Sequence, residues 1–383
     1  MGDALYVGLI SGTSADGIDA ALIAFDADVD GPVRLLTGRT FEYPSDLRES
    51  VLALADPGAR VDLDRFGEID ARLGEQFAQA ALALLAEAGV SASQVLAIGS
   101  HGQTVRHRPS GRYPFSMQLG DPSRIAEITG ITTVADFRRR DVAAGGQGAP
   151  LAPAFHRAVL GCPDEDRAVL NLGGIANVTL LPRSGPTLGF DTGPANALMD
   201  LWVADRCGLP FDRDGLLASA GTVVPDLLAD LLADPWFARS GPKSTGREHF
   251  CAEWLWSRLA DRARCLSDAD VQATLCALTA RTVADALGRD FPECTRLLLC
   301  GGGSHNPVLI RMLTELLPAV RVESIRRHGL DPDLIEAMIF AWLAGQTLAG
   351  RAGNLPSVTG AGGERVLGAI HPGHQAARDR SQR

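Results

Sequence analysis

One short turn near the start of the chain combines carboxylates with glycine and hydroxyl residues, the residue types that phosphate chemistry needs. The turn and the strand after it contain Ser11, Gly12, Thr13, Ser14, Asp16, Gly17 and Asp19. Its glycines and successive backbone N–H groups can converge on phosphate oxygens without bulky side chains between them. The two carboxylates would repel a bare phosphate, so they indicate a bridging cation or its water shell. An ordinary Gly/Asp hairpin turn is the competing interpretation.

A second carboxylate, Asp191, lies where an apolar run ends and Thr192-Gly193-Pro194 lead into a helical pattern. A carboxylate at a strand end, near a helix N-terminus, can act as a general base that faces a phosphate site. Capping of that helix by Asp191 or Thr192 is the alternative.

Three consecutive glycines, Gly301, Gly302 and Gly303, separate an apolar strand from a helical segment. Backbone without side chains can lie flat against a nucleotide. The pattern is not G-x-G-x-x-G, and no Rossmann unit opens the chain, so dinucleotide binding is not predicted. A tight turn alone would account for one or two of these glycines.

Polar residues also follow two further strands in the first half of the chain. His101 and Gln103 follow the strand at 95–100, while Asp136 and Arg138 follow the strand at 131–135. Guanidinium groups bind carboxylates in a bidentate manner, so the arginines at 138–140 either grip an anionic substrate or form a solvated basic turn. A metal pair of His101 and His107 lacks a third ligand at suitable spacing and is not expected.

Glu336 is the one carboxylate in an otherwise apolar stretch, from Leu334 to Trp342. If it is buried, it needs a partner, which a magnesium water shell would supply. If it faces solvent, it carries no functional meaning.

The elements that must position these residues occur as a repeated pattern. Short apolar runs at 5–10, 20–25 and 33–42 predict an antiparallel meander, and helical spacing from Phe66 to Leu85 predicts one long amphipathic helix. The same theme returns at 168–181 and 188–191, with helices at 195–207, 246–262, 268–287, 307–317 and 332–348 and strands at 296–300 and 320–324. A meander followed by helices and strands, present twice, predicts two related α/β domains with a cleft between them.

Composition agrees with an ordinary globular protein of two domains. The chain has 383 residues, 46% of them hydrophobic and 21% charged, and exceeds the size at which one core keeps growing. Its net charge of −10 argues against a nucleic-acid or anionic-membrane partner. No apolar run is long enough to span a bilayer, and no signal peptide opens the chain, so we expect a cytoplasmic protein.

The order of these motifs resembles the actin, Hsp70 and sugar-kinase superfamily, and more closely the anhydro-N-acetylmuramic acid kinase family. The blocks that carry the resemblance, in chain order, are 11–19, 100–104, 118–121, 135–138, 145–150, 171–177, 190–194, 241–246 and 300–303. The resemblance as a whole extends from about residue 5 to about residue 370. One departure is Ala195, where the resemblance leads us to expect a second glycine.

The resemblance implies two actin-like (ribonuclease H-like) domains that hold ATP and substrate in the cleft between them. We expect a first domain at 1–145 completed by 351–370, a second at 146–350, and a disordered tail at 371–383. The implied reaction is ATP-dependent phosphorylation of O6 of 1,6-anhydro-N-acetylmuramic acid while water opens the ring at C1, in the recycling of cell-wall peptidoglycan. The sequence leaves open whether the protein forms a homodimer.

The resemblance also implies roles for individual residues. Asp191 would take the proton of the water. His101, Gln103, Asp136 and Arg138 would bind the sugar, and Glu336 would hold Mg²⁺ through water. ATP and its phosphates would be bound by Ser11, Gly12, Thr13, Ser14, Asp16, Gly17, Asp19, Asn171, Gly173, Gly174, Gly301, Gly302 and Gly303. The alternatives are another sugar or carboxylate kinase of this superfamily, or a non-enzymatic nucleotide switch.

Overall fold

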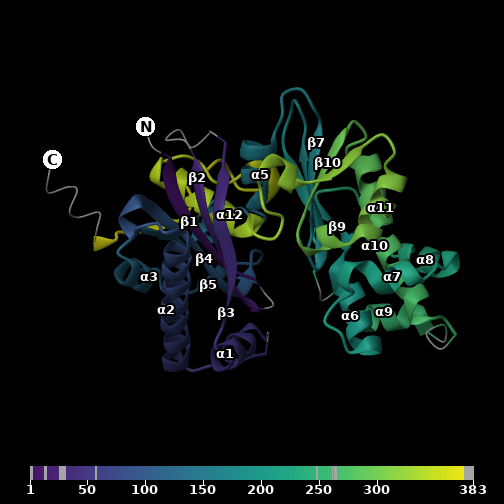
Figure 1. Ribbon diagram of the computed structural model, residues 1–383, viewed down its shortest axis with the longest axis horizontal. Helices are drawn as coiled ribbons and strands as arrows, with labels where there is room; N and C mark the ends of the chain where they lie inside the picture. The colour runs from purple at the N-terminus through teal and green to yellow at the C-terminus, as the bar shows by residue number, and fades with distance from the viewer. Residues whose placement is uncertain are drawn as a thin grey trace. The chain divides into compact units, whose positions relative to one another are not determined.

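The computed structural model describes residues 3–12, 15–25, 32–56, 58–246, 249–260, 262 and 265–374. The chain divides into two compact units, Met1–Val159 with Gly329–Arg383, and Leu160–His328. Each unit contains one sheet and its own helices (Figure 1).

The first unit begins with the antiparallel meander that the sequence predicts. Its strands are β1 Ala4–Ser11, β2 Gly17–Phe25, β3 Arg34–Glu42, β4 Val95–Arg108, β5 Phe115–Leu119, β6 Thr133–Ala135 and β12 Ala369–His371. Its helices are α1 Ser45–Ala55, α2 Leu63–Ala88, η1 Ala92–Gln94, α3 Pro122–Thr129, α4 Phe137–Ala143, α5 Ala152–Leu160, α12 Ile335–Leu348 and α13 Pro356–Thr359.

In the described residues, the first sheet runs in the order β12-β6-β4-β1-β2-β3, with β5 paired to β4. β1, β2 and β3 are antiparallel neighbours, whereas β4 and β6 continue the sheet parallel to β1. The carboxyl ends of the parallel strands β1, β4 and β6 therefore meet at one edge of the sheet. This edge receives Ser11, Gln103 and Asp136.

Helices cover both faces of this sheet. α2 packs its apolar side, including Leu73 and Phe77, on the face that carries Val7 and Leu9. α12 covers the opposite face and lies so close to β1 that a Cβ on Gly8 would come within 1.8 Å of the Ala337 carbonyl oxygen. Gly99 of β4 has the same relation to Phe340, at 1.9 Å. These two glycines permit the close packing of the apolar helix α12 on the sheet.

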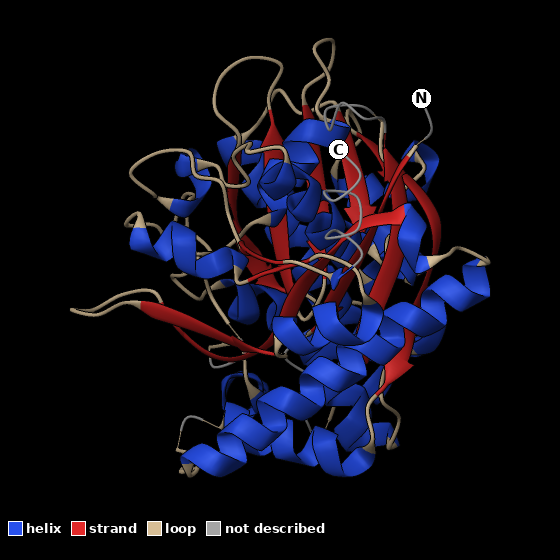
Figure 2. Cartoon of the chain, turned by 90° about the vertical axis from the view of Figure 1, so that its left-hand side faces the viewer, coloured by secondary structure: helices blue, strands red, loops and turns tan. Residues whose placement is uncertain are grey.

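The second unit repeats the same plan with different helices. Its strands are β7 Arg167–Leu172, β8 Ile175–Leu181, β9 Leu188–Pro194, β10 Arg296–Cys300 and β11 Arg321–Ser324. Its helices are α6 Asn196–Cys207, η2 Arg213–Gly215, α7 Leu216–Ala220, α8 Pro225–Leu232, α9 Ala252–Leu259, α10 Asp268–Asp290, η4 Gly302–His305, α11 Pro307–Leu316 and η5 Ile325–His328. Figure 2 shows the helices and strands of the whole chain by type.

The sheet of the second unit runs β11-β10-β7-β8-β9. β7, β8 and β9 are antiparallel, and β10 and β11 continue parallel to β7. This order matches β6-β4-β1-β2-β3 of the first unit strand for strand. The prediction of two related α/β domains of the actin-like class is therefore confirmed at the level of topology.

Several expected boundaries differ in the structure. Residues 146–159 and 329–350 belong to the first unit rather than the second. The second of these segments joins the first unit because α12 packs on β1, β2 and β4. The helix expected at 246–262 covers only Ala252–Leu259. His371 closes β12 against β6 instead of beginning a tail, and residues 375–383 of the expected disordered tail lie outside the described residues.

Within the described ranges, no single helix combines the length and apolar character needed to cross a membrane. One bent pair, Arg213–Ala220 with Pro225–Leu232, passes by length and composition alone.

Candidate active-site residues of the two units

Three polar side chains form a row across the second sheet. Asn171 of β7 pairs with Asn177 of β8, which pairs in turn with Asp191 of β9. Residues directly opposite one another in antiparallel strands project to the same face. All three are partly exposed, in a sheet otherwise lined by apolar residues. Both ends of this row were predicted from sequence motifs, whereas Asn177 was missed, because only the strand register places it beside them.

Asp191 is held by backbone groups of a segment some 50 residues later in the chain. Its N–H donates to the Lys243 carbonyl oxygen at 2.9 Å, and its Oδ2 accepts from the Thr245 N–H at 2.8 Å. Burial raises the pKa of Asp191 to about 6, although the Thr245 N–H and the charge of Lys243 act in the opposite direction. A carboxyl with such a pKa can accept a proton near neutral pH.

Asp191 does not cap the helix that follows it. The N-cap of α6 is Ala195, and no side chain caps this helix. Ala195 has a negative φ of −120°, so the glycine expected at this position is not required by the backbone. The Thr192 hydroxyl donates to the Ala176 carbonyl oxygen at 3.3 Å. The capping alternative is therefore wrong for both Asp191 and Thr192.

Lys243 is an almost buried cation beside this carboxylate. Its Nζ donates to the carbonyl oxygens of Trp236 and Phe237 at 3.3 and 3.2 Å and lies 4.2 Å from the centre of the Trp236 ring. Burial and the charge of Arg289 lower the pKa of Lys243 to about 8. In the sequence, the segment 241–246 is only one block of the family resemblance. No role was predicted from it for Lys243 or Thr245.

The two glycine turns of the second unit meet at Asn171 and Asn196. The carbonyl oxygens of Gly173 and Gly174 accept the N–H groups of Asn196 and Ala195, both at 3.0 Å. Gly301 has a φ of +77°, and a Cβ there would come within 2.3 Å of Asn171 Oδ1. A Cβ on Gly303 would come within 3.0 Å of Asn196 Oδ1. The structure thus brings together Asn171, Gly173, Gly174, Gly301, Gly302 and Gly303.

A pocket of about 420 Å³ opens beside the second glycine turn. Its wall combines the backbone of Gly302 and Gly303 with one aromatic ring, Phe211, and several polar groups. The remaining lining residues are Asn196, Met199, Asp200, Asp212, Arg213, Asp214, Gln272, His305 and Asn306. Mixed apolar and polar walls of this kind suit a small ligand with a flat ring and hydroxyl groups.

In the first unit, the β1–β2 turn is fastened at both sides. The Gly12 carbonyl oxygen accepts from Gln103 Nε2 at 3.1 Å and from the Ala15 N–H at 3.1 Å. Arg48 of α1 donates to the Ala15 carbonyl oxygen at 3.0 Å and to Asp16 at 3.1 Å. Thr13 and Ser14 lie outside the described residues. No sequence signal marked Arg48, which comes from a separate helix.

Two residues of this region have structural neighbours that the sequence did not reveal. Gly17 lies within β2, where a Cβ would come within 2.7 Å of the Phe41 carbonyl oxygen, so its lack of a side chain serves the pairing with β3. Asp19 accepts from Thr40 Oγ1 at 2.6 Å. Burial raises the pKa of Asp19, and the charges of Asp333 and Asp16 add to that rise.

β4 continues to Arg108 instead of ending at residue 100, so His101 lies within it. His101 and Arg138 of α4 form one pair. Arg138 Nε donates to His101 Nε2 at 2.9 Å and its Nη1 donates to the Gly148 carbonyl oxygen at 2.9 Å. The other imidazole nitrogen, Nδ1, therefore carries the proton and donates to the Gly102 carbonyl oxygen at 2.9 Å. Burial and the Arg138 charge hold the pKa of His101 well below its usual range, so the ring is neutral. His101 is bound to an arginine and is not a metal ligand in this arrangement.

Asp136 and Glu336 lie at the same end of the unit, the first partly exposed and the second exposed. Asp136 adopts a left-handed conformation, with φ of +59°, and its Oδ2 accepts from Arg139 at 3.2 Å. Glu336 belongs to the first turn of α12. Desolvation raises the pKa of Glu336, the charge of Arg138 lowers it, and that of Asp19 raises it. The structure thus places Glu336 within electrostatic reach of both Asp19 and Arg138.

The described residues contain no group of three or more His, Cys, Asp or Glu side chains that could hold a metal ion by themselves. Mg²⁺ is typically held by one or two carboxylates together with water and substrate phosphates. Asp16, Asp19 and Glu336 fit that mode, whereas a site built only from protein ligands does not fit.

Comparison with known proteins identifies the family. The sequence profile of the anhydro-N-acetylmuramic acid kinase family matches residues 4–373. An anhydro-N-acetylmuramic acid kinase of Xanthomonas campestris is 60% identical over 368 residues, covering 96% of this chain and 97% of that protein. One from Coxiella burnetii is 48% identical over 372 residues, covering 97% and 98%.

Among solved structures, the activator of the 2-hydroxyisocaproyl-CoA dehydratase from Clostridium difficile with bound ADPNP matches with a TM-score of 0.44 and 11% identity. The match covers 89% of this chain and 94% of that chain. A structural similarity with so low a TM-score does not contribute to the family assignment, which rests on the sequence matches. The chain belongs to the anhydro-N-acetylmuramic acid kinase family, as its motifs predict.

Proposed function

We propose that this kinase uses ATP and water to convert 1,6-anhydro-N-acetylmuramic acid into N-acetylmuramic acid 6-phosphate and ADP, with Asp191 as the general base. The match to the family along residues 4–373 is the observation that carries the reaction. The comparisons give no support to another kinase activity or to a non-enzymatic switch. The reaction belongs to the recycling of peptidoglycan fragments, and we place it in the bacterial cytoplasm.

The reaction explains why a base of this kind is needed. O6 of the anhydro-sugar is an ether oxygen with no proton to remove, so the proton that leaves belongs to water. The water oxygen bonds to C1 as the C1–O6 bond breaks, and O6 bonds to the γ-phosphorus as the bond from that phosphorus to ADP breaks. Asp191 Oδ2 is occupied by the Thr245 N–H, and no described residue donates to Oδ1. Oδ1 is therefore the oxygen available to take the proton.

We assign ATP to groups in both units, and the assignment in each unit rests on residues of that unit alone. In the second unit, the pocket beside Gly302 and Gly303 would take the base and ribose, and Asn171, Gly173 and Gly174 would face the phosphates. In the first unit, the segment 11–16 is assigned to the phosphates from its sequence, because a glycine- and hydroxyl-rich turn can offer backbone N–H groups to phosphate oxygens. Thr13 and Ser14 of this segment lie outside the described residues. Mg²⁺ would neutralise phosphoryl charge. Asp16, Asp19 and Glu336 would hold its water shell.

The sugar is assigned to the polar groups around Arg138. The substrate carries one carboxylate, and Arg138 is a half-buried cation of α4, oriented by His101 and Gly148. Gln103 is almost fully buried with its Oε1 unbonded, so its amide can orient toward a polar partner. Asp136 is partly exposed and can accept a hydrogen bond from the acetamido N–H.

Isotope labelling tests the reaction. In ¹⁸O-labelled water, the product should carry the label on C1, while O6 keeps its original oxygen because its bond to carbon 6 never breaks. The label must be read at early times against an unlabelled control, since C1 exchanges slowly with solvent. A sugar kinase that acts on a hydroxyl incorporates no solvent oxygen through its chemistry. A phosphorylated product that retains the intact anhydro bridge would refute the coupled mechanism.

A further inference from the structure

A series of polar contacts leads from Asp191 to a second carboxylate, Asp234, that no step of the reaction uses. The Thr245 N–H donates to Asp191 Oδ2 at 2.8 Å. The Thr245 hydroxyl contacts His249 Nδ1 at 3.3 Å, and His249 Nε2 contacts Asp234 Oδ2 at 3.4 Å. All four residues belong to the second unit.

Asp234 is a fixed anionic anchor. Its Oδ2 accepts from Trp254 Nε1 at 2.8 Å and from Arg258 at 2.9 Å, and its Oδ1 accepts from the Trp236 N–H at 3.0 Å. Burial alone would raise the pKa of Asp234. The hydrogen bonds from Trp254, Trp236 and His249 and the charge of Arg258 outweigh burial and hold this pKa below its usual value. Asp234 is therefore ionised and can only accept hydrogen bonds.

The anchor determines how His249 is oriented. Because the carboxylate accepts, His249 Nε2 must carry a proton, and in the neutral ring Nδ1 is then the acceptor for the Thr245 hydroxyl. The ring is also stacked on Phe250, with a centroid distance of 4.4 Å and an interplanar angle of 5°. Thr245 is thus held by a ring whose tautomer and plane are both fixed.

We propose that Asp234 and His249 are positioning residues for the general base, because they hold Thr245 so that its N–H occupies Oδ2 of Asp191 and leaves Oδ1 for water. This inference rests on the proposed role of Asp191. Lys243 supports the same geometry, since its carbonyl oxygen takes the Asp191 N–H at 2.9 Å. If Thr245 moves, the carboxylate loses its orienting donor and becomes free to rotate.

The variant His249→Phe tests the proposal, because it keeps a ring against Phe250 and removes both nitrogens. The Thr245 hydrogen bond stabilises ionised Asp191, so its loss should raise the acid limb of the kcat–pH profile by about one pH unit. Lys243 is the charged group that faces Asp191, and it is unchanged in this variant. At pH 6, kcat should fall about 5-fold, with the deficit shrinking by pH 8 and the KM for ATP unchanged.

Two further variants report on the same contact. Thr245→Val should reproduce the shift, and combining it with His249→Phe should add nothing, because both remove one interaction. Thr245→Ser keeps the hydroxyl and should retain the wild-type profile. His328→Phe is the matched control. It removes another histidine–carboxylate contact, to Glu323 at 3.3 Å, at the other end of the sheet and should leave the acid limb in place.

A readout that does not depend on activity separates this proposal from the one it rests on. The carboxyl of Asp191 can be titrated by ¹³C NMR in protein labelled at the aspartate carboxyls, with Asp191→Asn for assignment. If His249→Phe lowers the melting temperature but Asp191 titrates as in wild type, His249 is merely structural and the proposal is overturned. If Asp191 titration shifts while Asp191→Asn keeps its turnover, the positioning contact stands and the catalytic role of Asp191 falls.

Discussion

Carboxylates lie at both ends of the second sheet, but they have different roles at the two ends. Toward the carboxyl end of β7, Asn171, Asn177 and Asp191 form a polar row across β7, β8 and β9, in which one carboxylate oxygen has no described donor. At the amino ends, Arg167, Arg296 and Arg321 occupy equivalent positions of β7, β10 and β11. Every one of these arginines has a carboxylate partner.

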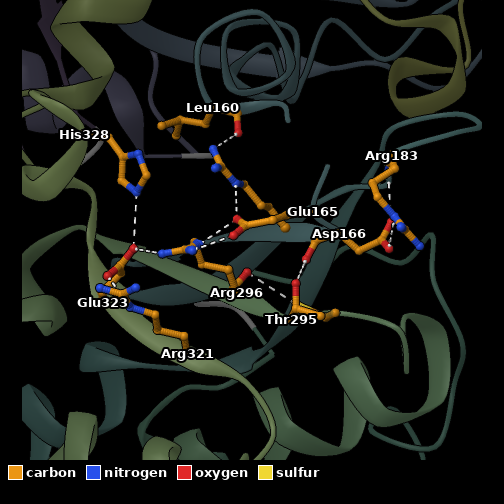
Figure 3. A network of polar contacts seen from close by, with 11 residues as sticks. Leu160, Glu165, Asp166, Arg183, Thr295, Arg296, Arg321, Glu323 and His328 are labelled. Atoms are coloured by element: carbon orange, nitrogen blue, oxygen red, sulfur yellow. Dashed lines mark hydrogen bonds and ion pairs between the residues drawn. The ribbon is translucent and has the colours of Figure 1, made fainter. Parts of the chain in front are cut away.

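Glu165 and Glu323 neutralise this row of arginines. Figure 3 shows Arg296 between them, bound to Glu165 at 2.6 and 2.7 Å and to Glu323 at 2.5 Å. Arg167 and Arg321 complete the network, each 2.9 Å from one of these glutamates. Hydrogen bonds from Arg296 and Arg167 lower the pKa of Glu165 to about 2, and the hydrogen bonds that Arg296 donates to Glu165 and Glu323 raise the pKa of Arg296.

The contrast shows that the partners of a carboxylate decide its role. Glu165 is surrounded by guanidinium groups and stays charged at any ordinary pH, so it can hold structure but cannot exchange protons. Among the described residues, the Asp191 carboxylate has a single backbone donor and one neighbouring cation, Lys243, and burial raises its pKa to about 6. A carboxyl poised near neutral pH is suited to proton transfer.

The largest expected effect comes from Asp191→Asn, which removes the base while keeping its shape. Turnover should fall by about 10²–10⁴-fold, the usual range for loss of a general base. Binding of a non-hydrolysable ATP analogue, measured by calorimetry, should stay close to wild type. Turnover within a few-fold of wild type would show that Asp191 does not take the proton.

At the amino end, Arg296→Met should lower stability rather than turnover. Breaking a partly buried network leaves two glutamates without their shared partner, and we expect a loss of about 2–3 kcal/mol in the free energy of unfolding. Urea denaturation measures this loss. The kcat of the folded enzyme should be unchanged. A large fall in kcat with unchanged stability would remove the distinction between the two ends.

The pH dependence of stability should differ in sign between the ends. The pKa of Asp191 is raised on folding, so ionisation of this group lowers the stability of the fold as pH rises from about 4 through about 6. Asp191→Asn should therefore increase the free energy of unfolding by about 1–2 kcal/mol at pH 8 and leave it unchanged near pH 3.5. The pKa of Glu165 is lowered to about 2, so its contribution is present above its ordinary pKa near 4.5 and is lost as pH falls toward 2. Glu165→Gln should therefore destabilise the protein at neutral pH.

Urea midpoints at pH 4, 6 and 8 for both variants check these signs. A loss of stability in Asp191→Asn at pH 8 would contradict the raised pKa. A gain in Glu165→Gln at pH 8 would contradict the lowered one.

The smallest effect is expected from Asn177, the middle of the polar row. Asn177→Ala removes one neutral polar group beside Asp191 and should lower kcat about 3- to 10-fold with little change in unfolding free energy. Steady-state kinetics and thermal melting measure the two quantities. Asn171→Ala is the comparison within the row, because Asn171 also contacts the Gly301 turn and its loss should raise the KM for ATP as well.

Local sequence pattern determined most of the elements and the ends at which the functional residues lie. The alternation and length of apolar runs marked both meanders, and the strand-end position of Gly301 followed from them. These features depend on residues a few positions apart, so a single sequence contains the information. The predicted strand-end positions of Asp191 and Gln103 were wrong, because β9 continues to Pro194 and β4 continues to Arg108.

Tertiary structure alone decided which distant residues meet at the site. Strand register put Asn177 beside Asp191, and α1 brought Arg48 to the first turn. The Thr245 N–H is the one described donor to the Asp191 carboxylate, and it lies 54 residues away in sequence. Helix α12 joined the first unit because Gly8 and Gly99 leave room for its backbone, although the sequence between 146 and 350 reads as one continuous domain. Such contacts depend on packing between surfaces that no local pattern encodes, and they set the pKa and the orientation on which the chemistry depends.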